Sequence, residues 1–472
     1  MALVSVFYLI GLLIAMLFFY GVPSDYKRWV LVFFSALFIG LFNFASLFLL
    51  LLSSTITFFA ASKIKENQWL FCTMMAFYIV CLFGLKYLFV PENSLGDVAH
   101  FQQTATIVFL GVSFYTLQNI GYLMGIYRGQ TKPSTDFIAF FSFNAFFPKI
   151  ASGPIESYDV FGRSLETIGE TRFSTTNLIY GIQRIALGFF KKMVLADRLA
   201  PLVANVYGLE SPATGLTLWV GICLFTLQLY FDFSGYMDIV LGSARLFDIR
   251  LSENFKRPLS ATSISELWRK WHITLIAWLT QFIYYPIVYR MRKHNRVGVL
   301  FATAVVFILS GYWHGVGLTF LVWAVWNMLC LWYEILTKKT RVKWSKNTPQ
   351  WIYRPLSIFI TFNVFSLGLL FFRSASVADG LLLLKGVFTG VFLPQSFLND
   401  FVYLLGMGGT QEHLFNFYST TLFCMGFLLL EKNIYGLFYS EKISSLSLVV
   451  LVVLICMFGI FEAGSNFIYL QF

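Results

Sequence analysis

Charged residues are scarce in this chain of 472 residues. Asp, Glu, Lys and Arg make up 12% of it, about half of the share that is usual in a soluble globular protein. Residues 297–333 contain none of these four types. Many apolar stretches reach the roughly 20 residues that cross a bilayer as a helix. The scarcity of charge therefore excludes a soluble protein and predicts an integral membrane protein with many spans.

Several motifs of soluble catalytic and binding sites are also missing. The chain has no P-loop and no Gly-x-Gly-x-x-Gly, which excludes the familiar nucleotide-phosphate cradles. It has no His-x-x-x-x-Asp of soluble-site glycerolipid acyltransferases, no Gly-x-Ser-x-Gly elbow and no His-Glu-x-x-His or Cys/His cluster. The six cysteines occur without a Cys-x-x-Cys and are interpreted as small buried hydrophobic residues. No resident metal or cofactor is expected.

The positions of the basic residues predict which loops face the cytoplasm. The net charge of +11 reflects this loop asymmetry and is not a nucleic-acid footprint. The acidic segments 91–103 and 394–413 contain no Lys or Arg and are expected outside. By the positive-inside rule, six groups of basic residues face the cytoplasm: Lys27 and Arg28, Lys63 and Lys65, Arg128 and Lys132, and segments 245–270, 290–296 and 338–354. The long apolar stretch before Lys63 fits a tight helical hairpin.

Counting from these loops predicts about 11 transmembrane helices with both termini outside the cytoplasm. Residues 3–22 lack a basic n-region and a clean cleavage site, so we expect a retained first helix. The last apolar stretch, residues 446–469, is interrupted only by Glu462. Residues 372–393 are interrupted by Arg373 and Asp379, so the sequence does not predict whether they cross the membrane.

Two apolar runs have basic loops at both ends, so neither can cross the membrane once. These are residues 271–289 and 297–333. Two full crossings and a turn need about 40 residues, so the second run is a short hairpin or a re-entrant pair. Its glycines predict the turn at "SGYWHGVG", residues 310–317. Non-helical backbone at membrane depth is tolerated only where protein buries it or it lines a cavity.

Two histidines fall within these runs. His314 lies in the predicted turn, and His272 opens the shorter run. An ionisable residue at membrane depth indicates function by default, although a lone histidine can simply hydrogen-bond a carbonyl. A histidine can act as a general base near neutral pH. That chemistry suits the transfer of an activated acyl group to a hydroxyl.

A third feature is "LQLYFDFSGYMDIV", residues 227–240. Asp232 and Asp238 are six residues apart, which does not stack two carboxylates on one helical face. Paired acid and base carboxylates are therefore disfavoured. Ser234 and Gly235 predict a helix break that lines a cavity, or a structural polar turn.

Six stretches carry a resemblance to a known family. They are "VSFYTLQNIGYLMGIYRG" (112–129), "FFPKIASGPIESY" (146–158), "YFDFSGYMDIVLG" (230–242), "ENFKRPLSATSISELWRKWHITLIAWL" (253–279), "GYWHG" (311–315) and "NFIYLQF" (466–472). Together they resemble the membrane-bound O-acyltransferases, in the bacterial branch of alginate, peptidoglycan and cellulose O-acetyltransferases. The chain departs from the expected pattern at Glu156, where a basic residue is often found.

The resemblance implies a single all-α membrane domain over residues 1–472, with its motif-bearing core at about 112–335. Its fold is a ring of transmembrane, re-entrant and short helices around a central tunnel. The resemblance implies that His314 is catalytic and that His272 is the second active-site residue. Further residues are expected to shape or support the tunnel: Asp232, Ser234, Tyr236, Trp268, Trp271 and Trp313.

The resemblance also implies an acetyltransferase of the cytoplasmic (inner) membrane that modifies an extracytoplasmic polysaccharide. The expected donor is cytosolic acetyl-CoA, whose phosphates could be attracted by Arg257, Arg269, Lys270 and Arg292. The expected partner is a periplasmic or surface serine-hydrolase-like (SGNH) acetyltransferase, and the acetyl group reaches the polysaccharide directly or through that partner.

Two alternatives stay open. One is transfer of D-alanyl or another acyl group to teichoic acid, lipid or protein. The other is a proton-coupled transporter or flippase that uses His272, His314 and Asp232 as a relay. A transporter predicts inverted repeats, and the sequence shows none.

Overall fold

The computed structural model describes residues 5–88, 109–207, 215–389, 411–439, 445–461 and 467–468. These residues form helices and loops and contain no strand, although Phe255 and Trp271 make one isolated antiparallel bridge. The prediction of an all-α protein is confirmed. The predicted outer loops are residues 91–103 and 394–413. They lie outside the described residues, except that residues 411–413 begin helix α21.

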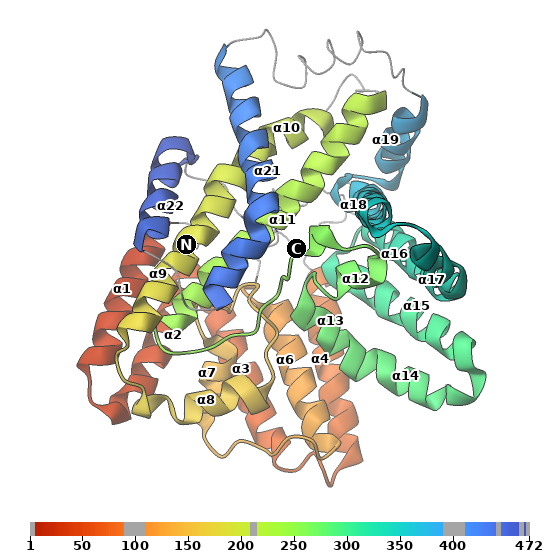
Figure 1. Cartoon of the computed structure of the whole chain (residues 1–472). Helices are drawn as coiled ribbons and strands as arrows, with labels where there is room; N and C mark the ends of the chain where they lie inside the picture. Colours follow the sequence, from red (N-terminus) through yellow and green to blue (C-terminus); the bar gives the residue numbers. More distant parts are fainter. Residues whose placement is uncertain are drawn as a thin grey trace.

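Three groups of helices can be followed in Figure 1. The first, at the lower left and centre, contains α1 (Val6–Gly21), α2 (Lys27–Phe42), α3 (Phe44–Ala61), α4 (Gln68–Leu88), α6 (Val112–Tyr127), α7 (Phe137–Ala145) and α8 (Arg163–Glu166). The second contains α9 (Thr175–Phe189), α10 (Asp197–Tyr207), α11 (Gly215–Arg245), α21 (Gln411–Tyr439) and α22 (Ser445–Phe458). The third, at the right, contains α12 (Ile264–Trp268), α13 (Ile273–Leu279), α14 (Tyr285–Arg290), α15 (Asn295–His314), α16 (Leu318–Leu336), α17 (Lys338–Asn347), α18 (Gln350–Arg373) and α19 (Val377–Thr389).

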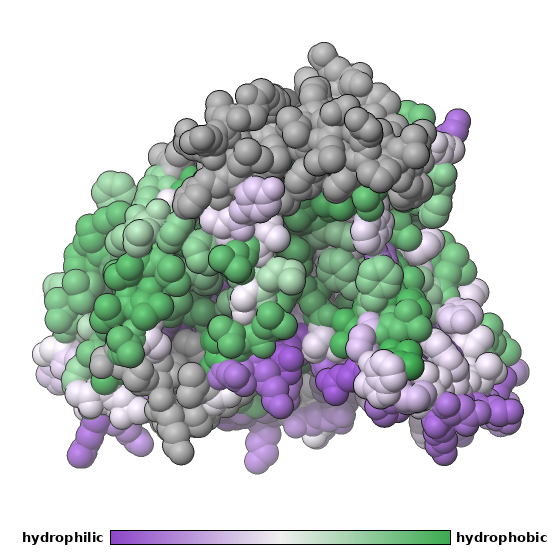
Figure 2. Space-filling model, turned by 45° about the horizontal axis from the view of Figure 1, so that its top comes forward, coloured by the Kyte–Doolittle hydropathy of each residue, from purple (hydrophilic) through white to green (hydrophobic). Residues whose placement is uncertain are grey.

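Five helices of the described chain are long and apolar enough to cross a membrane. They are Phe44–Ala61, Gly215–Arg245, Arg292–His314, Leu318–Leu336 and Gln350–Arg373. Shorter apolar helices cover Val6–Gly21, Gln68–Gly84 and Leu446–Phe458. Figure 2 shows apolar residues over much of one face and hydrophilic residues gathered along its lower edge, as expected for a membrane protein. The number of about 11 spans stays a prediction.

Helix α11 is a long central element that runs without a break through Ser234 and Gly235. The predicted break there is wrong, because Gly235 serves close packing instead of a bend. A Cβ on Gly235 would lie 2.9 Å from the backbone oxygen of Gly188 in α9, and one on Gly242 would lie 2.6 Å from that of Gly181. Small residues at such crossings let two helix backbones approach closely inside a membrane.

Buried ion pairs join α11 to α9 and to the π-helical segment Phe190–Ala196. Arg184 Nε lies 2.6 Å from Asp238, and Lys191 Nζ also lies 2.6 Å from Asp238. Lys192 Nζ lies 2.8 Å from Asp232. Charges at such depth are tolerated because each has an opposite partner.

The chain returns to α11 near its end. The backbone N–H of Ile468 donates to Asp232 at 2.8 Å, and Phe467 is fully buried. In the last apolar stretch, residues 446–469, helix α22 ends at Phe458. Residues 467–468 instead bring the chain back to the buried charges.

The two sequence runs with basic ends fold differently. In residues 271–289, α13, a π-helical segment (Thr280–Tyr284) and α14 follow one another as a continuous helical stretch from Ile273 to Arg290, so the expected turn back is wrong there. Residues 297–333 form α15 and α16 and do turn back, but the turn covers only residues 315–317 of the predicted 310–317, and His314 is the last residue of α15 instead of part of the turn. The predicted hairpin before Lys63 is also confirmed, because Asn43 ends α2 and caps α3. Residues 372–393 contain the end of α18 and the short α19, which explains why no single span could be assigned.

Candidate active site

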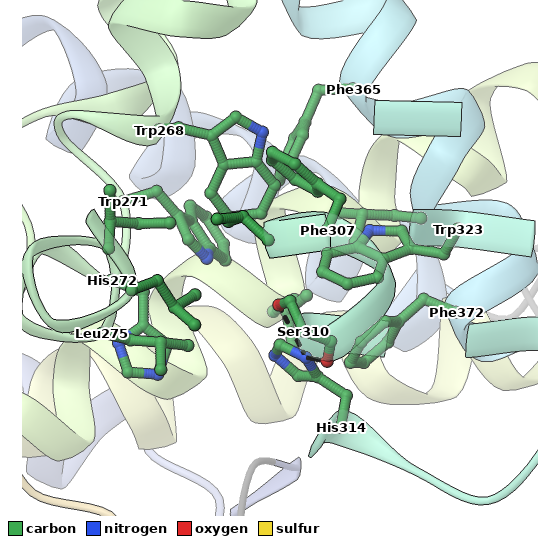
Figure 3. Close-up of a pocket in the computed structure, with 15 residues that line it drawn as sticks. Trp268, Trp271, His272, Leu275, Phe307, Ser310, His314, Trp323, Phe365 and Phe372 are labelled. Carbon is green, nitrogen blue, oxygen red and sulfur yellow. Dashed lines mark hydrogen bonds between the residues drawn. The ribbon is translucent and has the colours of Figure 1, made fainter. Parts of the chain in front are cut away.

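A small enclosed cavity lies where α11, α13, α15, α16 and α18 meet (Figure 3). Its volume is about 10 Å³, roughly the space that one water molecule needs. The lining residues are Leu229, Trp268, Trp271, His272, Leu275, Ile276, Leu279, Val306, Phe307, Ser310, His314, Trp323, Phe365, Leu369 and Phe372. The polar groups facing this space come from the two histidines, Ser310 and the tryptophan indoles, and no carboxylate lines it.

His314 is the last residue of α15, and only 3% of it is exposed. Its Nδ1 lies 2.6 Å from the backbone oxygen of Ser310, one helical turn earlier. Because a carbonyl oxygen can only accept, Nδ1 carries the proton and donates. This hydrogen bond fixes the tautomer and makes Nε2 the basic nitrogen of the ring.

Aromatic rings surround the His314 imidazole. Ring centroids lie 4.8 Å away for Trp313, 4.9 Å for Trp323 and 5.6 Å for Phe372. All three aromatic residues are buried. They keep bulk water from the imidazole and hold its plane, so that the ring presents Nε2 in one direction.

His272 reaches the same cavity from the other side (Figure 3). It precedes α13 in the left-handed backbone region, at φ 48° and ψ 48°. Asn254 holds this bend: its backbone oxygen accepts from Ile273 N–H at 3.0 Å, and its Oδ1 accepts from Thr274 N–H at 3.0 Å. The His272 ring packs 5.0 Å from the ring of Phe233. The two histidines, far apart in the sequence, therefore line one cavity.

Only some of the residues expected to shape the tunnel lie at the cavity. Trp268 and Trp271 line the cavity, whereas Trp313 packs on both histidine rings. The other three, Asp232, Ser234 and Tyr236, belong to the buried part of α11 and do not line the cavity. Asp232 pairs with Lys192, and Tyr236 OH accepts from the N–H of Ser152 at 2.9 Å.

Among the residues expected to attract donor phosphates, Arg257 lies on a segment that pairs with the segment of Arg269 and Lys270, because the N–H of Lys256 donates to the backbone oxygen of Lys270 at 2.9 Å. Arg257 Nε lies 3.8 Å from Glu431, and the exposed Arg292 stacks over Tyr289. Arg269 is exposed, and its neighbour Lys270 lies 2.6 Å from Glu266. Nothing in this arrangement tests their proposed role.

Glu266 anchors the loop that carries Trp268. Its Oε2 accepts from the N–H and the hydroxyl of Thr262, at 2.8 and 2.7 Å. Partial burial acts to raise the pKa of Glu266, but the hydrogen bonds from Lys270 and Thr262 outweigh it and lower the pKa to about 2. The carboxylate therefore stays charged at neutral pH and fixes the start of α12.

Some residues of the site were missed in the sequence. Asn327 is fully buried and accepts from Trp268 Nε1 at 3.2 Å. Because it is an amide inside a long apolar run, the sequence alone could have marked it as a candidate site residue. Ser310, Phe307, Phe365 and Phe372 carried no signal, because they resemble the many other apolar or small residues of the chain. Glu156, the departure from the expected pattern, accepts from the Ser252 N–H at 2.6 Å and so ties two loops together.

Comparison with known proteins identifies the family of the chain. The model of the membrane-bound O-acyltransferase family matches residues 132–377, just over half of the chain. A peptidoglycan O-acetyltransferase of Helicobacter pylori is 30% identical over 402 residues, which cover 77% of this chain and 74% of that protein. A "probable alginate O-acetylase" of Pseudomonas fluorescens is 34% identical over 56% of this chain and 52% of its own length.

A teichoic acid D-alanyltransferase of Bacillus subtilis is 28% identical over 56% of this chain and 69% of that protein. The matched part spans about half the length of the alginate O-acetylases.

Proposed function

The chain belongs to the membrane-bound O-acyltransferase family, and from this premise we propose that it moves an acetyl group from cytosolic acetyl-CoA toward an extracytoplasmic polysaccharide. The observation that carries the proposal is the buried cavity that His314, held by the Ser310 carbonyl, and His272 both line. The O-acetyltransferase names of several relatives support polysaccharide as the acceptor class.

The reaction needs one base and an aligned thioester. His314 Nε2 takes the proton from the acceptor hydroxyl while the hydroxyl oxygen attacks the acyl carbonyl carbon. A carbon–oxygen bond forms, the carbon–sulfur bond breaks, and the proton passes from His314 to the leaving sulfur, giving a free thiol. His272 orients or polarises the carbonyl. The aromatic surroundings exclude water, so hydrolysis of the thioester does not compete.

The donor and the partner form part of the same proposal. The cytosolic basic residues Arg257, Arg269, Lys270 and Arg292 would attract the phosphates of CoA. A separate SGNH-type acetyltransferase outside the membrane would receive the acetyl group and pass it to the glycan. The protein would act in the inner membrane with both termini outside.

The cavity favours acetyl over D-alanyl. A D-alanyl group carries an ammonium, and burying that charge without a carboxylate partner is costly. None of the lining residues is Asp or Glu. This argues against D-alanyl transfer, although a D-alanyltransferase is among the relatives.

The test is the acetyl content of envelope polysaccharide in a deletion strain. The strain is complemented with wild type, His314→Ala or the matched control His294→Ala, in which the histidine is exposed. Wild type and the control should restore alkali-labile acetate. His314→Ala should restore about 10²–10⁴-fold less at equal membrane abundance, because a general base contributes that much. Equal restoration by His314→Ala would refute the mechanism, and no acetate with any variant would refute the substrate class.

A further inference from the structure

The cavity beside the two histidines ends in a wall of aromatic rings. Trp268 lies at the centre of that wall (Figure 3). Its ring centroid is 5.5 Å from that of Phe307, 5.8 Å from Phe365 and 5.9 Å from Trp323. Each of these residues is at least 93% buried. These packed rings bound the cavity on the side of Trp268.

The position of Trp268 is fixed by its hydrogen bond to Asn327. Trp268 Nε1 donates to Asn327 Oδ1 at 3.2 Å, and Asn327 Nδ2 donates to the backbone oxygen of Trp323 at 2.9 Å. Asn327 therefore holds the indole of Trp268 against helix α16.

Helix α12, which carries Trp268, is attached to α16 at a second place. The carboxylate of Glu334 accepts from the N–H groups of Ile264 and Ser265, at 2.7 and 3.1 Å. Because both attachments lead to α16, Trp268 cannot move back without breaking buried hydrogen bonds.

We infer that Trp268, positioned by Asn327, sets the upper length of the acyl group and limits it to two carbons. This inference rests on the proposed function. For His314 to serve the attack, the acyl carbonyl must lie between the two histidines, which directs the acyl methyl toward the wall. Each further methylene would have to displace packed ring atoms, and overpacking of a dense interior is unfavourable.

The expected preference for acetyl over longer acyl groups follows from how strongly apolar pockets reject one extra methylene. A pocket that is one methylene too small rejects the longer substrate by about 10–200-fold. Wild type should therefore transfer butyryl, with two extra methylenes, at least about 100-fold less efficiently than acetyl. Trp268→Leu removes the indole from the centre of the wall and should bring the two rates within about tenfold of each other.

The experiment uses membranes that contain the full chain together with the endogenous polysaccharide acceptor. Acetyl-, propionyl- and butyryl-CoA are supplied singly, and mild alkali releases the transferred acids for quantification. The variants are Trp268→Leu, Trp268→Phe and Asn327→Leu. The matched control is Trp326→Leu, because its indole also donates to a carbonyl, that of Val364 at 2.9 Å, but it does not line the cavity.

The readout is the butyryl-to-acetyl ratio, which does not depend on how much variant folds. We expect the ratio to rise at least tenfold in Trp268→Leu, less in Trp268→Phe and Asn327→Leu, and not at all in Trp326→Leu. If Trp268→Leu fails to fold, the two milder variants decide. An unchanged ratio in every folded Trp268 and Asn327 variant overturns the assignment while the proposed function stands. Absence of acetyl transfer from acetyl-CoA by wild type overturns the proposed function and this inference together.

Discussion

Replacing Asp238 by Asn tests whether the buried charges of α11 stabilise the fold or serve the reaction. Asp238 lies 2.6 Å from both Arg184 and Lys191, and all three side chains are at most 1% exposed. The replacement keeps the shape and removes the negative charge. Arg184 keeps Glu253 at 2.7 Å, but Lys191 is left without a carboxylate partner among the described residues.

Breaking a buried pair in this way costs about 3–5 kcal/mol, because a desolvated charge stays behind. We expect the detergent-solubilised protein to lose its monodisperse gel-filtration peak about 3–5 °C earlier on heating. Acyl transfer per folded molecule should not change, since Asp238 does not line the cavity. The matched control, Asp25→Asn, changes an exposed carboxylate and should shift stability by less than about 0.5 kcal/mol.

A second replacement tests whether the unpaired Lys191 causes the loss of stability. Adding Lys191→Met to Asp238→Asn removes the stranded charge, so the double variant should regain about 1–3 kcal/mol over the single one. If Asp238→Asn were as stable as the Asp25→Asn control, the carboxylate would contribute no net stabilisation. If the double variant were less stable than the single one, the stranded lysine would not be the cause of the loss.

Three further predictions concern backbone and pH. His272→Asn should fold to wild-type levels because Asn tolerates the left-handed region, whereas the β-branched His272→Val should be destabilised by about 1–3 kcal/mol; membrane abundance and thermal stability distinguish them. Gly235→Val places a Cβ 2.9 Å from the Gly188 backbone oxygen and should be destabilised by about 1–3 kcal/mol or more in the same heating assay, and wild-type stability would refute the close packing. The folded-state pKa of Glu266 is lowered to about 2, so its contribution to stability is fully present above its unfolded pKa, near 4.5, and is lost as the pH falls toward 2. The stability difference between wild type and Glu266→Gln should therefore shrink between about pH 4.5 and pH 2 in a pH series of unfolding measurements, and a difference that grows on acidification would contradict the sign.

The two histidines could be found in the sequence because topology and charge single them out. A run without charged residues between two basic loops has to turn back inside the membrane, and the glycines around His314 mark the place. His272 opens the second uncharged run between basic loops, although that run forms one continuous helical stretch from Ile273 to Arg290 and does not turn back. These arguments use local composition, so they need no knowledge of which helices pack together.

The wall of the cavity could not be predicted in this way. Its rings come from α12, α15, α16 and α18, and the chain has 12 tryptophans and 55 phenylalanines. No spacing separates the few that meet from the many that face lipid. Which aromatic residues gather depends on how distant helices cross, and that is a property of the tertiary packing.

The error at Ser234 and Gly235 has the same origin. A glycine inside an apolar helix indicates either a bend or a close neighbour, and the sequence of α11 alone does not distinguish them. The neighbour is Gly188 of α9. Likewise, Lys191 and Lys192 look like a basic cytosolic pair, yet both are buried against the carboxylates of α11.

The hydrogen bond from Ile468 to Asp232 has a consequence for the order in which the protein is made. The two residues are 236 positions apart. At about 5–20 residues per second, the ribosome adds Ile468 roughly 10–50 s after Asp232. During that interval Lys192, only 40 positions before Asp232, can already neutralise the carboxylate inside the membrane. The core charges can thus be paired early in synthesis, long before Ile468 adds its hydrogen bond to Asp232.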